Sequence, residues 1–166
     1  MRKDSIQIEL NGAVDEAQAA VGAARAEFER GSEANELLSQ VQRDLYVLMA
    51  EVATAPKNRH RLVAGSSLVT DEMVSWLEGK IDDLTRRFDM PTDFVIPGEN
   101  RRSASLDVAR TIVRRAERVM VSLTTEESAV GRYLNRLSDF LWVFARWQED
   151  SALLALPHDS PRQSTR

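Results

Sequence analysis

Apolar residues recur every three to four positions along most of this chain, which is the spacing of an amphipathic helix. The first stripe covers residues 6–24, and Gly31 followed by Ser32 ends that element. The second covers residues 37–52 and is closed by Pro56, because proline cannot continue a helix. The pattern therefore predicts two helices in the first third of the chain.

Three more helices are predicted from the remaining pattern. Thr70 is followed by two acidic residues, which is typical of a helix start, and Pro91 ends that third helix. A fourth helix is expected from near Ser103 to about Leu123. Residues 124–127, Thr-Thr-Glu-Glu, fit a capping box that would begin a fifth helix reaching about residue 150.

The connecting segments complete an all-α prediction. Residues 57–69 read as a loop, residues 94–98 as a short apolar turn, and no segment is a convincing strand. We expect one helical bundle over residues 1–150, of up-and-down type, and a polar, disordered tail over residues 151–166.

Composition narrows the classes of function. The chain has 166 residues, a net charge of -4 and no cysteine, so it can form no disulfide, and a nucleic-acid partner is not expected. No apolar run approaches the ~18 residues needed to span a bilayer, and the first residues lack a signal-peptide core, so we expect no membrane partner and a cytoplasmic location. His60 and His158 are isolated from each other, so no metal site is predicted.

The predicted fourth helix carries an unusual row of cations. Arg110, Arg114 and Arg118 are spaced i, i+4 and i+8, which puts them on one helix face. Three guanidinium groups repel one another, so anions must lie close by. Those anions are either carboxylates of neighbouring elements on a solvated face or the phosphates of a ligand, which arginine binds bidentately.

Two further polar positions stand out among apolar or small residues. Asn135 lies between Leu134 and Leu137, so it is expected to be partly buried, bonded to another helix, to a ligand, or to Asp139 four residues on. Asp15 lies among glycines and alanines of the first helix, which suits either close contact with another helix or plain solvent exposure.

Four segments together resemble the PduO-type ATP:corrinoid adenosyltransferases. They are Gly-Ala-Val-Asp-Glu (12–16), Phe-Val-Ile-Pro-Gly (94–98), Ala-Arg-Thr-Ile-Val-Arg-Arg-Ala-Glu-Arg (109–118) and Arg-Tyr-Leu-Asn-Arg-Leu-Ser-Asp-Phe-Leu (132–141). The resemblance implies a five-helix bundle that forms a homotrimer with active sites between subunits. It also implies a reaction in which Co(I) of a reduced corrinoid (cobalamin) attacks the 5′ carbon of ATP, triphosphate leaves, and Mg²⁺ assists.

The resemblance also implies roles for individual residues. Phe94 would keep the lower axial face of the corrinoid apolar, and Asp15 would pair with Arg114 across the subunit interface. Arg114 and Arg118 would contact the ATP phosphates. Asn135 would contact the nucleotide, and Glu117 and Arg110 would support this array. A flavoprotein reductase or a B12-dependent enzyme would be a partner.

The sequence also departs from the family pattern. A Thr-x-Thr-Gly-Asp-x-Gly segment that wraps the triphosphate is not in this sequence. Glu99 and Asp107 replace a glycine and a histidine and add negative charge, which should disfavour ATP. Two hypotheses follow: a longer, active enzyme whose start lies upstream, or a non-catalytic corrinoid-binding or carrier paralogue.

Overall fold

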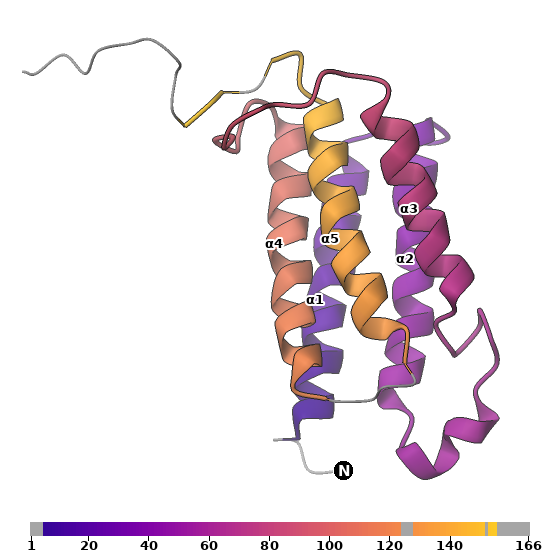
Figure 1. Cartoon of the computed structure of the whole chain (residues 1–166). Coiled ribbons are helices and arrows are strands. Elements are labelled where there is room, and N and C mark those ends of the chain that lie inside the picture. Colours follow the sequence, from indigo (N-terminus) through magenta and orange to yellow (C-terminus); the bar gives the residue numbers. More distant parts are fainter. Residues whose placement is uncertain (1–4, 124–127, 152, 156–166) are drawn as a thin grey trace, which may run out of the picture.

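The computed structural model describes residues 5–123, 128–151 and 153–155. The elements of this part of the chain, shown in Figure 1, are α1 (Ile6–Ala26), α2 (Glu33–Ala53), the 3₁₀ helix η1 (Pro56–Arg61), α3 (Asp71–Thr85), α4 (Arg101–Val121) and α5 (Val130–Trp147). The described residues form no regular strand and only two isolated bridges. The all-α, five-helix prediction is confirmed.

Local side chains explain where several helices begin. At the start of α2, the Ser32 hydroxyl accepts a hydrogen bond from the backbone N–H of Asn35. Thr70 caps α3 in the same way by accepting from the backbone N–H of Met73. At α4, Asn100 and Ser103 exchange side-chain and backbone bonds in a reciprocal capping box. This box starts α4 two residues earlier than the sequence pattern predicts. The capping box predicted at 124–127 lies outside the described residues.

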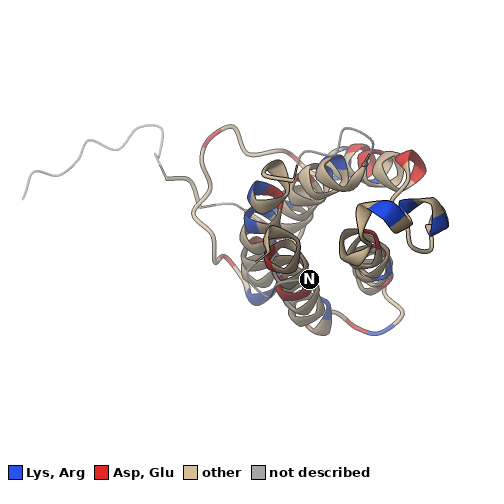
Figure 2. Ribbon diagram, turned by 90° about the horizontal axis from the view of Figure 1, so that it is seen from below, with Lys and Arg blue, Asp and Glu red and all other residues tan. Residues whose placement is uncertain are grey.

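The helices run alternately up and down, as Figure 1 shows. α1 packs against α2 and α4, and α5 packs against α4 and α3. The connection 86–100 passes over the end of the bundle from α3 to α4. η1 lies at the end of the bundle opposite this connection, and its Lys and Arg residues are blue in the end-on view of Figure 2. None of the helices in the described ranges is long and apolar enough to cross a bilayer.

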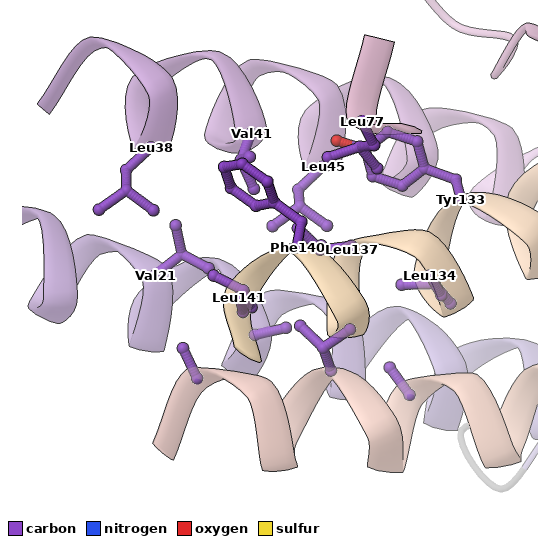
Figure 3. Close-up of a cluster of buried hydrophobic side chains, with 14 of the residues drawn as sticks. Val21, Leu38, Val41, Leu45, Leu77, Tyr133, Leu134, Leu137, Phe140 and Leu141 are labelled. Carbon is purple, nitrogen blue, oxygen red and sulfur yellow. The ribbon is translucent and has the colours of Figure 1, made fainter. Parts of the chain in front are cut away.

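More than half of the residues of α5 are buried. Its side chains Leu137, Phe140 and Leu141 are fully buried and meet apolar residues from α1, α2 and α3 in the core drawn in Figure 3. Truncating a buried leucine or phenylalanine of this kind costs about 2–5 kcal/mol, because lost burial and a residual cavity add together. The core therefore fixes the position of α5, which carries Asn135 of the candidate site.

Three boundaries differ from the predictions. The loop predicted at 57–69 contains η1, and Arg59 of η1 pairs with buried Glu51 at 2.9 Å. α3 and α5 end earlier than predicted, at Thr85 and Trp147. Residues 153–155 of the predicted tail pair with the 94–96 turn through an antiparallel Val95–Leu154 bridge. Most of that tail lies outside the described residues, so the domain boundary at 150 stays a prediction.

Candidate functional site

The arginine ridge of α4 is unevenly balanced. The Nε atom of Arg110 lies 3.6 Å from a carboxylate oxygen of Asp107, and the Arg110 side chain is largely covered. The Arg114 side chain is 47% exposed and donates to Glu117 across 3.2 Å. Arg118 is exposed and forms no ion pair with any other residue that the structure describes. The ridge therefore keeps positive charge that faces solvent.

Glu117 connects the ridge to α5. One of its carboxylate oxygens accepts from Arg114, and the other accepts from the Asn135 side-chain amide at 2.8 Å. The side-chain oxygen (Oδ1) of Asn135 in turn accepts a hydrogen bond from Arg136 at 2.7 Å. Asp139 pairs with Arg136 at 3.4 Å. Of the partners that the sequence offered for Asn135, the structure therefore shows a residue of another helix, Glu117, and not Asp139. Asn135 is half-buried, as predicted.

An open groove of about 1040 Å³ lies beside this Glu117–Asn135 pair, between α3 and the α4–α5 pair. Arg132 and Arg136 of α5 line it, and Arg132 bonds Asp71 at the start of α3 at 2.6 Å. Sequence reasoning did not assign these two arginines to the site. Their spacing of i and i+4, with Asn135 at i+3, is the signal that would have placed all three on one face.

The structure does not bring Asp15 and Phe94 to this groove. Asp15 is exposed on α1, and its neighbour Glu16, not Asp15, forms an ion pair with Arg115 of α4. Phe94 is 84% exposed in the turn that precedes α4. Glu117 lies about 24 Å from the first residue of α4, Arg101, at a rise of ~1.5 Å per residue. Within one chain the predicted site residues thus occupy three separate places.

Asp107 does not act as the free negative charge that the sequence suggested. Its side chain is buried, with 4% of the residue exposed, and it forms a salt bridge with buried Arg146 of α5. The expectation that its charge disfavours ATP is therefore wrong: a guanidinium group neutralises that charge inside the bundle. Glu99 lies outside this pair, and its effect stays a prediction.

The chain was then compared with known proteins. The family model described as "Cobalamin adenosyltransferase" matches residues 1–148. A corrinoid adenosyltransferase of Citrobacter freundii is 38% identical over 150 residues, covering 89% of this chain and 83% of the relative. One from Bacillus subtilis (strain 168) is 34% identical over 150 residues, covering 87% and 75%.

Solved structures show the same relationship. A variant of the PduO-type ATP:corrinoid adenosyltransferase from Lactobacillus reuteri, complexed with cobalamin and ATP, superposes with a TM-score of 0.77. The two chains are 30% identical, and the match covers 89% of this chain and 82% of the other. Fold and comparisons agree, and this chain belongs to the cobalamin adenosyltransferase family.

Proposed function

We propose that this protein is an ATP:corrinoid adenosyltransferase. Co(I) of cob(I)alamin would attack the 5′ carbon of ATP, a cobalt–carbon bond would form, and the C5′–O bond would break to release triphosphate. The observation that carries the proposal is the solvent-facing positive charge of Arg114 and Arg118 next to the Glu117–Asn135 pair. In the part of the chain that the structure describes, Glu117 is the one carboxylate paired with these two exposed guanidinium groups, which are therefore suited to a polyphosphate.

The arginine ridge would bind the phosphates of ATP, and Asn135 beside the groove would bind the rest of the nucleotide. Arg110, Arg114 and Arg118 would bind the phosphates and offset the charge that develops on the leaving triphosphate. Glu117 would hold Arg114 and Asn135 in place through its two oxygens, leaving Asn135 to contact the nucleotide. Magnesium binds through one or two carboxylates together with substrate phosphates. A magnesium ion would therefore be held chiefly by the ATP phosphates.

The remaining roles require more than one chain. Phe94, exposed on its turn, would cover the lower axial face of the corrinoid and exclude water and other ligands. Asp15, exposed on α1, would pair with Arg114 of a neighbouring subunit. The separation of these residues within one chain supports a homotrimer with active sites between subunits. The cytoplasm as the location and a reductase or B12-dependent partner belong to the same proposal.

Adenosylation can be measured directly. The purified protein is mixed anaerobically with ATP and chemically reduced cob(I)alamin, and adenosylcobalamin is followed by absorbance while triphosphate is quantified. We expect steady turnover with one triphosphate released per adenosylcobalamin, and none when ATP is omitted. Binding of cobalamin without turnover would contradict the enzyme and favour the carrier hypothesis.

A further inference from the structure

A chain of buried charges links the arginine ridge to the far end of α5. Arg146 donates to Asp107 of α4, and its Nε lies 3.0 Å from a carboxylate oxygen of Glu149, just past the end of α5. The side chains of Arg146 and Glu149 are only 2% and 1% exposed. Arg110 approaches the other oxygen of Asp107 at 3.6 Å. The four charges alternate in sign and sum to zero.

The residues that follow Glu149 fasten the Phe94 turn. The Ile96 amide donates to the Leu153 carbonyl and the Ala155 amide donates to the Phe94 carbonyl, each at 2.7 Å. At the other end of this stretch, the Asn100 side chain donates to the Gln148 carbonyl at 2.8 Å. The 94–100 stretch is thus held by hydrogen bonds to Gln148, Leu153 and Ala155, and the buried Glu149 side chain anchors the backbone next to Gln148.

Stability alone is a weak reason for such a network. Burying charges is costly, and well-packed apolar residues in place of a buried ion network are often neutral or stabilising. Burial raises the pKa of the Glu149 carboxyl despite the opposing effect of Arg146, so this ionised group is held at a cost. A planar guanidinium that faces carboxylates from two different elements does, however, fix their relative position. Here those elements are α4 and the stretch after α5, whose residues Leu153 and Ala155 bond the Phe94 turn.

We propose that Asp107, Arg146 and Glu149 are positioning residues that hold the Phe94 turn and Arg110 in a fixed relation to each other. The Glu149 end would set how well the corrinoid side of the site is formed, while the Asp107 end would also act on the phosphate side through Arg110. The catalytic consequence rests on the proposed function. The structural consequence, a turn whose order depends on Glu149, does not.

Hydrogen exchange tests the structural part without any activity. In Glu149→Ala we expect the amides of Ile96 and Ala155 to exchange at least tenfold faster, with core amides of α2 unchanged. Glu149→Gln keeps an acceptor for Arg146 and should restore most of this protection. Glu33→Ala, which removes an exposed carboxylate from Arg87, is the matched control and should leave both amides as in the wild type.

Steady-state kinetics test the catalytic part. Glu149→Ala should raise the KM for cob(I)alamin at least fivefold and leave the KM for ATP within twofold, whereas Asp107→Asn should raise both. Unchanged exchange at Ile96 and Ala155 would overturn the inference. So would faster exchange throughout α2, or an equal rise of both KM values in Glu149→Ala, because each would indicate general loosening of the fold.

The experiments still decide the inference if Glu149→Ala does not fold or if the wild type is inactive. If Glu149→Ala does not fold, Arg146→Lys replaces it, since an ammonium keeps the charge but loses the planar fork, and the same two amides should exchange faster. If the wild type shows no adenosylation, the proposed function fails, and the exchange result still decides whether Glu149 positions the turn.

Discussion

Two arginines on neighbouring helices, Arg146 of α5 and Arg114 of α4, occupy opposite environments. The Arg146 side chain is 2% exposed and faces carboxylates of Asp107 and Glu149. The Arg114 side chain is 47% exposed, and among the described residues it pairs with one carboxylate, that of Glu117, which also accepts from Asn135. A guanidinium whose charge is balanced inside the fold is part of the structure, and one that shares a single acid at the surface is free to take an anionic ligand.

The buried acid Glu51, like Arg146, is paired with opposite charge inside the fold. Glu51 of α2 accepts from the Val69 amide at 2.7 Å, from the Ser128 hydroxyl at 2.7 Å, and from Arg59 at 2.9 Å. These contacts tie η1 and the beginnings of α3 and α5 to one carboxylate. Glu51, like Arg146, thus has its charge balanced inside the fold, which sets both apart from the exposed Arg114.

The largest expected effect is on the buried side of the comparison. Arg146→Ala leaves Asp107 and Glu149 as buried carboxylates without their shared cation, so we expect a loss of about 3–5 kcal/mol in the free energy of unfolding. Urea denaturation followed by circular dichroism measures it. Arg87→Ala removes an exposed arginine with two acidic partners and should unfold close to the wild-type midpoint. Equal losses in the two variants would erase the distinction between the buried and the exposed arginine.

The sequence predicted the features that depend on one helix but not the contacts that join different helices. Periodicity predicted the five helices, and i, i+4 spacing predicted the ridge, because both depend on neighbours within one element. The bond from Asn135 to Glu117 and the pair of Asp107 with Arg146 join different helices, and no local spacing encodes them. That is why Asp107 read as a free charge in the sequence, while its neutralising partner stands 39 residues away.

The next effect in size concerns the exposed arginine. Arg114→Ala should lower kcat/KM for adenosylation at least 100-fold, about 2.7 kcal/mol of transition-state stabilisation at ~1.36 kcal/mol per decade. The free energy of unfolding of the single chain should stay within about 0.5 kcal/mol, because Arg114 is a surface residue.

The proposed pairing of Arg114 with Asp15 adds an assembly readout for this variant. Sedimentation should show a weaker trimer than in the wild type, and Arg87→Ala again serves as the control. A variant with wild-type rate and assembly would remove Arg114 from the site.

The smallest expected effect is the pH dependence of Asp44, a buried acid that has hydrogen bonds but no ion pair with any described residue. Burial raises the pKa of the Asp44 carboxyl above its ordinary 3.8, although Gln40 and Tyr133 donate to it at 2.8 and 2.9 Å. Between 3.8 and the raised pKa the folded state holds the proton more tightly than the unfolded state, so Asp44 costs stability progressively as pH rises through that window.

Asp44→Asn removes this titration, so its stability relative to the wild type should improve as pH rises from about 3.5 to 7. Urea unfolding at several pH values gives the difference, and exposed Asp83→Asn should not show the same trend. A pH-independent difference between Asp44→Asn and the wild type would mean that the bonds from Gln40 and Tyr133 fully compensate burial. In that case a carboxylate could be balanced in this core without a cation, and the contrast between Arg146 and Arg114 would apply to arginines alone.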